Sequence, residues 1–245
     1  MRLNIVCVAA LVTLLGLVVA AALGTGAMTV LVGVGAVVTG AGWVRLQGLT
    51  AARAHGVVIA LAGIASALVA LRLPSAYLTW AGLIAALGLI AVFLIELLRG
   101  TGAARRLEAL VASSSGVALT ALGAGWIGSL RVATEQHAAL IGVTAVAAFA
   151  AVLMAAVPWP DRMIGPLCVL VATAVAPLVA LLVGESGAGT AALLGAVAGL
   201  VVATFRRMVL ADGGPRTRLG AVAVGVGPVL AAGSAFYGAQ LLIAS

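Results

Sequence analysis

Charged residues are so scarce in this sequence that they decide which solvent the chain can fold in. Only 8% of the 245 residues are charged, whereas 64% are hydrophobic. A soluble domain carries about 25% charged residues and needs them to cover its surface. A bilayer makes the opposite demand, because hydrocarbon accepts apolar side chains and requires backbone polar groups to be bonded internally. The composition therefore predicts an all-α integral membrane protein, folded as a polytopic transmembrane helical bundle.

Apolar runs long enough to cross a bilayer recur along the whole sequence. About 20 helical residues span the roughly 30 Å hydrocarbon core. Polar and turn-forming breaks, among them Pro74 and Pro158, separate nine such runs. No connection is long enough for a soluble domain, so we predict a single transmembrane domain over residues 1–245. The predicted spans are 4–23, 27–44, 57–73, 76–98, 107–130, 138–157, 164–183, 189–205 and 219–242. If the first run is instead a cleaved signal peptide, eight spans remain.

The arginines give an independent test of this count. All thirteen basic residues are Arg, and this bias, with the abundance of Ala and Gly, is typical of high-GC bacterial genomes. With the N-terminus in the cytoplasm and alternating connections, only Arg72 and Arg131 fall outside. The other eleven are inside, as the positive-inside rule requires: Arg2, Arg45, Arg53, Arg99, Arg105, Arg106, Arg162, Arg206, Arg207, Arg216 and Arg218. We therefore expect a bacterial cytoplasmic membrane protein with its N-terminus inside and its C-terminus outside.

The net charge of +7 has the same explanation. Arginines in short cytoplasmic loops contact anionic lipid head groups, so lipid rather than nucleic acid is the expected partner. Trp43, Trp80, Trp126 and Trp159 lie near predicted span ends, where interfacial tryptophans anchor helices. Cys7 and Cys168 both lie in apolar runs, so we predict two unpaired cysteines.

Ionisable residues inside spans are the usual indicators of a membrane site, because they are costly there. No predicted span carries one near its centre. Glu96 precedes Arg99 by three residues and Glu108 follows Arg105 by three, a spacing that favours solvated ion pairs at the cytoplasmic interface. The functional alternative is a cytoplasmic vestibule lined by Glu96, Glu108, Ser113 and Ser114.

Catalytic and metal chemistry find little support in the sequence. His55 and His137 are predicted at opposite membrane faces, so they cannot share a metal ion. A serine nucleophile in the Ser113–Gly116 stretch would need a histidine, and His137 lies at the far face. The chain has no Lys for a Schiff base or a phosphate loop. We therefore predict no catalytic residue, no metal and no cofactor.

Small residues at a spacing of four form stripes on several predicted helices. Such stripes allow helix backbones to approach closely. We expect packing within the chain; the alternative is dimerisation or docking against another membrane protein. Pro177 and Pro228 lie inside predicted spans, where a kink frees a carbonyl that can face a cavity. The main stripes are Gly116, Thr120 and Ala124, and Ala191, Gly195, Gly199 and Ala203.

One segment carries a resemblance to known proteins. Leu-Leu-Arg-Gly-Thr-Gly-Ala-Ala-Arg-Arg-Leu-Glu runs from Leu97 to Glu108 and is followed by Ala-Leu-Val-Ala-Ser-Ser-Ser-Gly. These twenty residues resemble a segment of small multi-pass membrane proteins of high-GC bacteria, some of them labelled permeases. The resemblance implies a lineage and not an activity.

Two functions therefore stay open on the sequence alone. The first is a permease-like protein that moves a small or lipidic solute, supported by the number of spans and the intramembrane prolines; the absence of a buried charge for coupling speaks against it. The second is a non-catalytic structural or assembly subunit that binds other membrane proteins through small-residue faces.

Overall fold

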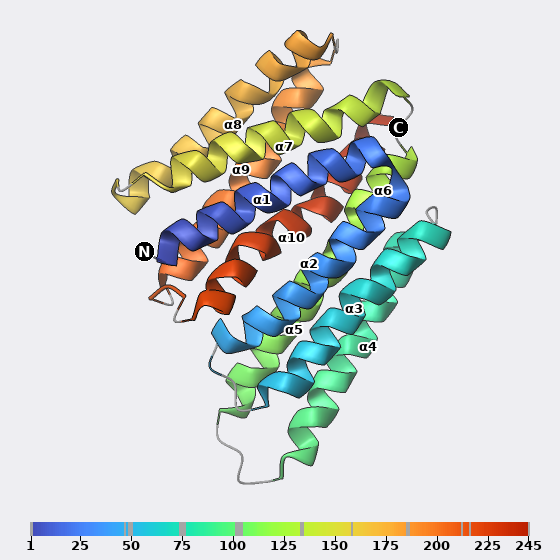
Figure 1. Ribbon diagram of the computed structural model, residues 1–245, viewed down its shortest axis with the longest axis vertical. Helices are drawn as coiled ribbons and strands as arrows, with labels where there is room; N and C mark the ends of the chain where they lie inside the picture. Colours follow the sequence, from blue (N-terminus) through green and yellow to red (C-terminus); the bar gives the residue numbers. More distant parts are fainter. Residues whose placement is uncertain are drawn as a thin grey trace.

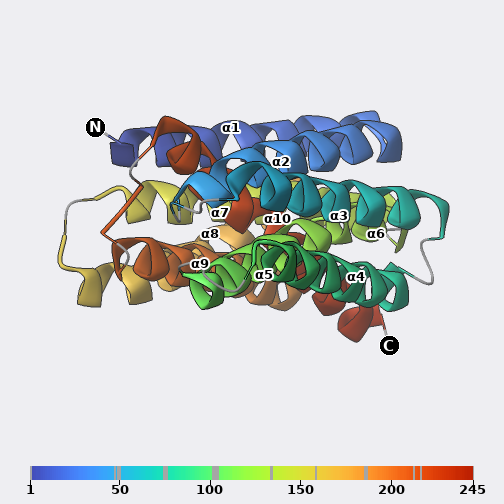
Figure 2. The same ribbon diagram turned by 90° about the horizontal axis from the view of Figure 1, so that it is seen from below.

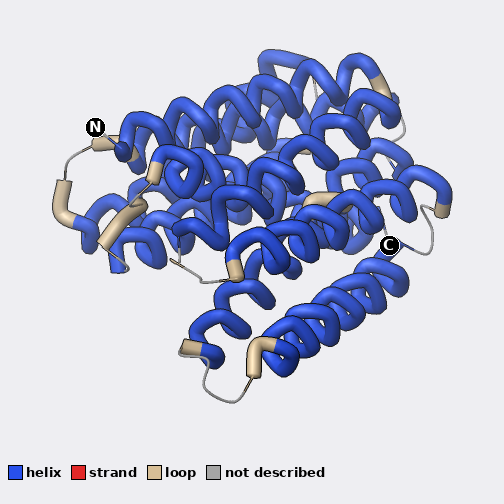
Figure 3. The backbone as a smooth tube through the Cα atoms, turned by 60° about the horizontal axis from the view of Figure 1, so that its bottom comes forward, coloured by secondary structure: helices blue, strands red, loops and turns tan. Residues whose placement is uncertain are grey.

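The computed structural model is all-α in every part of the chain that it describes (Figure 3). It describes residues 2–46, 48, 51–73, 77–100, 105–132, 135–157, 159–184, 187–211, 213–215 and 217–244. The helices are α1 (Arg2–Leu23), α2 (Thr25–Leu46), α3 (Ala52–Arg72), α4 (Tyr77–Leu98), α5 (Arg106–Leu122), α6 (Gly125–Val132), α7 (Glu135–Ala155), α8 (Asp161–Val183), α9 (Ala188–Ala211) and α10 (Arg218–Ala244).

The helices run along a common direction, with the two chain ends at opposite ends of the bundle (Figure 2). Helices α7, α8 and α9 form one flank, and α3, α4 and α5 form the other (Figure 1). Helices α1, α2 and α10 lie between the two flanks. Because α10 contacts α1, α2, α5, α6 and α9, it forms the centre of the bundle.

The all-α helical bundle predicted from the sequence is confirmed, and its apolar helices are compatible with a multi-pass membrane protein. Eight helices among the described residues are long and apolar enough to cross a membrane. A ninth, shorter apolar helix covers Ala139–Ala155 within α7. Large apolar side chains cover the outward faces of α4 and α8, as lipid requires. Cys7 and Cys168 are both free, as predicted.

The fifth predicted span differs from the structure in one respect. Residues 107–130 are expected to form a continuous helix, but α5 ends at Leu122 and α6 begins at Gly125. The break lies at a close approach between backbones, because a Cβ on Gly125 would lie 2.3 Å from the carbonyl carbon of Gly233 on α10. The helix is therefore interrupted where α10 leaves no room for a side chain.

Two of the four tryptophans do not lie where an interfacial anchor would. Trp43 and Trp126 are 1% and 2% exposed, whereas Trp80 and Trp159 are exposed. The Trp43 indole donates to the carbonyl of Ala112 at 2.9 Å, and the Trp126 indole donates to that of Val229 at 2.8 Å. These two rings therefore join helices inside the bundle instead of marking its interface.

Candidate functional site

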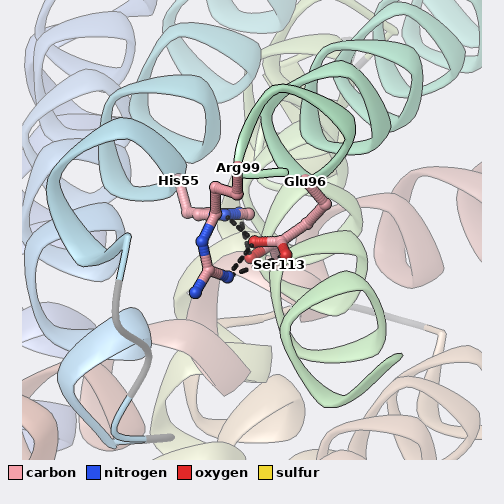
Figure 4. Close-up of polar contacts among 4 residues, drawn as sticks. All are labelled: His55, Glu96, Arg99 and Ser113. Atoms are coloured by element: carbon pink, nitrogen blue, oxygen red, sulfur yellow. Dashed lines mark hydrogen bonds and ion pairs between the residues drawn. The ribbon is translucent and has the colours of Figure 1, made fainter. Parts of the chain in front are cut away.

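A chain of polar side chains crosses three helices near the end of the bundle where α3 and α5 begin and α4 ends. Ser113 Oγ of α5 lies 2.7 Å from His55 Nδ1 of α3. His55 Nε2 lies 2.9 Å from Glu96 Oε1 of α4. Arg99, one turn beyond Glu96, donates from Nη1 to both carboxylate oxygens at 2.7 Å (Figure 4). We call these four residues the His55 cluster.

The cluster is enclosed although it is built from ionisable groups. His55 and Ser113 are fully buried and Glu96 is 2% exposed. The Arg99 side chain is 20% exposed and connects the cluster to the end of the bundle. Ser113 lies seven residues after the start of α5, about 10 Å along its axis.

Small residues on α5 bring Ser113 within reach of His55. A Cβ on Gly116 would lie 2.6 Å from the end of the Ile59 side chain and 2.9 Å from the Trp43 ring, so glycine lets both side chains pack directly against α5. One turn further, the Thr120 hydroxyl donates to the Ile59 carbonyl at 2.8 Å. Gly116 and Thr120 of the predicted stripe therefore pack within the chain, against α3, whereas Ala124 is buried in the break between α5 and α6.

A second close contact seals the cluster from the side of α2. Gly56, the residue after His55, faces Gly40 of α2, and a Cβ on Gly40 would lie 2.4 Å from the Gly56 carbonyl oxygen. Trp43 of the same helix covers α5 beside the cluster through its bond to Ala112. Among the described residues, Gly40, Gly56 and Trp43 thus pack beside His55, which is fully buried.

The contacts define which atoms of the cluster carry a hydrogen. An ionised carboxylate only accepts hydrogen bonds, so His55 Nε2 must donate to Glu96. In a neutral imidazole Nδ1 is then the acceptor, and the Ser113 hydroxyl donates to it. Every polar side-chain atom of His55 and Ser113 is satisfied in this state, with the Glu96 charge balanced by Arg99.

The same heavy-atom positions also accommodate one additional proton. If Nδ1 gains a proton, it donates to Ser113 Oγ, and the hydroxyl has only to rotate. Glu96 then balances the imidazolium as well as Arg99. The cluster therefore has two protonation states that share one packing arrangement.

Other charges near His55 are few and positive. On α5, Arg106 lies two turns before Ser113 on the same helix face, and its Nε and Nη2 have no partner among the described residues. Arg45 of α2 and Arg53 of α3 are exposed at this end of the bundle. Glu96 is thus the negative group that faces His55 within the described structure.

Ser113, His55 and Glu96 have the order of contacts found in nucleophile–base–acid triads. The serine, however, is fully buried in the middle of a helix, with no space beside it for a substrate carbonyl and no free backbone N–H to stabilise an oxyanion. In the described part of the chain, no three His, Cys, Asp or Glu side chains are placed to hold a metal ion. The arrangement is suited to holding a proton.

The structure separates the four residues predicted to line a vestibule. Glu96 and Ser113 belong to the His55 cluster, where Glu96 is buried and not a solvated interfacial group. Glu108 pairs with Arg105 in the open, each with 58% of its side chain exposed. Ser114 is half-buried and makes no contact with the cluster that the structure records. The His137 side chain lies outside the described residues.

Sequence reasoning missed His55 because it looked for a histidine partner of Ser113 only in His137. The sequence does contain a pattern that points to His55. His55, Glu96 and Ser113 lie at the same predicted membrane face, near the ends of three consecutive spans. Consecutive spans with short connections are commonly neighbours, so these residues could have been tested as one group.

Comparison with known proteins adds no relative. None of the protein-family models, curated proteins or solved structures compared with this chain matches it. Function is therefore inferred from the His55 cluster and its surroundings.

Proposed function

We propose that this chain is a permease-like protein of a bacterial cytoplasmic membrane, which moves a lipidic solute together with a proton taken up at His55. The observation that carries the proposal is the burial of His55 and Glu96 among apolar helices. Desolvating such groups costs several kcal/mol. Intramembrane ionisable residues are therefore rare and are associated with ion and proton pathways. The cluster also supplies the buried charge whose absence spoke against a permease at the level of sequence.

The proposal includes nine crossings with the N-terminus inside and the C-terminus outside. Helices α5 and α6 would form one crossing of Arg106–Arg131, and α7, with its apolar part Ala139–Ala155, another. Termini at opposite ends of the bundle agree with an odd number of crossings. The arginine distribution supports a position of the end that carries the His55 cluster at the cytoplasmic face.

Proton uptake would be linked to helix movement by the enclosure of Nδ1. Its lone pair is covered by Ser113, so a proton from water reaches it only when α3 and α5 separate. The step adds one proton to Nδ1, rotates the Ser113 hydroxyl and breaks no covalent bond. Each cycle of opening and closing would then carry one proton between the two protonation states.

The alternative of a structural or assembly subunit requires a small-residue face that is free to bind a partner. The stripe on α9 is already covered by α8, since Cβ atoms on Gly195 and Gly199 would lie 2.3 and 2.7 Å from carbonyl oxygens of that helix. Among the described residues, the exposed faces of α4 and α8 instead carry large apolar side chains that suit lipid. These observations favour the permease-like function.

A fluorescent-lipid assay tests the proposal. Liposomes containing the protein and a trace of phosphatidylglycerol with a nitrobenzoxadiazole label are bleached from outside with dithionite, with and without a pH gradient. We expect the gradient to accelerate movement of the labelled lipid between leaflets. His55→Gln and Glu96→Gln should remove the acceleration, because neither variant retains an imidazole beside a carboxylate.

Two matched variants serve as controls for this assay. Glu108→Gln removes the carboxylate of the exposed pair, and His137→Gln removes the second of the two histidines. Both should retain the gradient-dependent movement. Equal rates in the parent protein, the His55→Gln variant and protein-free liposomes would contradict the proposed function.

A further inference from the structure

An apolar cavity lies away from the His55 cluster, where the α7–α9 flank meets the central helices. It has a volume of about 90 Å³ and is lined by residues of α1, α6, α7, α9 and α10. Roughly 10–15 Å³ of such space holds one water molecule, so the cavity has room for about six to nine groups of that size. It is too large to be a packing defect of a single methyl group.

The lining is apolar almost throughout. Its few polar side chains are Cys7, Thr144 and Arg206, apart from the indole of Trp126. The Thr144 hydroxyl donates to the Leu140 carbonyl of its own helix at 2.8 Å, and the Trp126 indole donates to Val229. An apolar cavity of this kind does not hold water well but binds apolar molecules.

The cavity is long, and it extends over one half of the bundle. On α1 its lining runs from Val6 to Leu14, and on α9 from Ala198 to Leu210. At 1.5 Å per residue these stretches cover about 12 and 18 Å. The hydrocarbon core of a bilayer is about 30 Å thick, so the cavity has the depth of one leaflet.

Arg206 is the charged residue of the lining, and it lies at the end of the bundle where α1 begins and α7 ends. Its Nε donates to the carbonyl of Ala155, the last residue of α7, at 3.0 Å. The apolar part of the cavity extends from there toward the middle of the bundle. A positive group at the interface and an apolar slot of one leaflet's depth match a phosphate head group and an acyl chain.

Pro228 of α10 lies in the cavity wall and leaves one helix hydrogen bond unmade there. Proline lacks an N–H and cannot bond to the carbonyl four residues earlier, which here belongs to Val224. Pro228 and Val224 both line the cavity. The residue at which the sequence predicts a kink therefore belongs to the lining of the cavity.

We propose that this cavity binds part of one acyl chain of an anionic phospholipid from the leaflet that α1 enters, with the phosphate beside Arg206. The occupant is a lipid of the surrounding membrane because the apolar lining suits an acyl chain and Arg206, the charged residue of the lining, suits an anionic head group. This binding site would identify the class of solute that the proposed function moves, and in that respect the inference rests on the proposed function. Binding itself requires no transport.

Photochemical labelling tests the binding site. Liposomes of phosphatidylcholine with a small fraction of phosphatidylglycerol, whose acyl chain carries a diazirine, are irradiated with the protein, and the labelled peptides are identified by mass spectrometry. We expect the label on α1 and α9 within the ranges Val6–Leu14 and Ala198–Leu210. Label confined to the exposed faces of α4 and α8 would overturn the proposal.

A variant that fills the cavity, with a matched control, tests whether the label depends on the cavity. Ala148→Phe on α7 introduces a ring into the cavity and should reduce labelling of the lining about tenfold. Ala150→Phe, on the same helix but not in the lining, should leave it unchanged. Equal labelling in the two variants would overturn the proposal, and circular dichroism checks that both retain their helix content.

The head group is tested separately with Arg206→Gln. In the parent protein, labelling by the phosphatidylglycerol probe should exceed labelling by a phosphatidylcholine probe with the same chain, and Arg206→Gln should remove this preference. Equal labelling by both probes in the parent protein would overturn the anionic assignment. Labelling of the cavity without any movement of fluorescent lipid would support this binding site while contradicting the proposed function.

Discussion

Replacement of Glu96 by alanine is expected to lower the free energy of unfolding in detergent by about 3 kcal/mol. The variant leaves the His55 Nε2–H without its acceptor inside the bundle and removes both hydrogen bonds from Arg99. A buried donor that loses its partner bears the full cost of its desolvation. The shift is measured as the change in the unfolding midpoint, followed by circular dichroism as sodium dodecyl sulfate replaces the mild detergent.

Glu108→Ala is the matched control, because it breaks another Arg–Glu pair of the same spacing. Both members of that pair are 58% exposed, so water replaces the lost contact. Exposed ion pairs contribute less than about 1 kcal/mol. If the two alanine variants shifted the midpoint equally, the description of Glu96 as a buried, bonded carboxylate would be wrong.

Gly195→Ala is expected to destabilise the α8–α9 pair by about 3 kcal/mol, at the upper end of the range for overpacked interiors. The new Cβ would lie 2.3 Å from the Ala172 carbonyl oxygen and 2.7 Å from the Ala176 Cβ. A backbone oxygen cannot rotate away, so the helices must separate. The unfolding midpoint measures the loss.

Gly189→Ala on the same helix provides the comparison. A Cβ at Gly189 meets nothing within 4 Å, and alanine is a better helix former than glycine. This variant should be as stable as the parent protein or slightly more so. A loss at Gly189 similar to that at Gly195, or a change of oligomeric state with no change of stability in Gly195→Ala, would show that the stripe serves an interface between chains.

The sequence predicts the membrane character of the fold because it follows from composition. Apolar runs and the breaks between them locate the long helices to within a few residues. Because hydrocarbon cannot bond backbone polar groups, apolar runs of this length fold as helices there. The interruption between α5 and α6 could not be predicted this way. It depends on the approach of Gly125 to Gly233, more than a hundred residues away in the sequence.

The candidate site shows the same division between local and distant information. The spacing of Glu96 and Arg99 predicts an ion pair, which the structure contains. Whether water reaches that pair depends on what α2, α3 and α5 place around it, and Gly40, Gly56 and Gly116 decide this by allowing close packing. The position predicted for Trp43 was wrong for a similar reason. Hydropathy gives the depth of a residue in the membrane but not the direction in which its ring points, and the Trp43 ring points into the bundle.

Every proposal about a cytoplasmic His55 cluster and an inner-leaflet cavity depends on the number and direction of the crossings. Single cysteines introduced at Gly187 and Gly213, in a background without Cys7 and Cys168, test both with a membrane-impermeant maleimide on intact cells. Nine crossings with the N-terminus inside predict that the cysteine at 187 reacts from outside, and that the one at 213 reacts only after permeabilisation. If α7 does not cross, or if the orientation is reversed, the two positions exchange their behaviour, and that result would contradict the account.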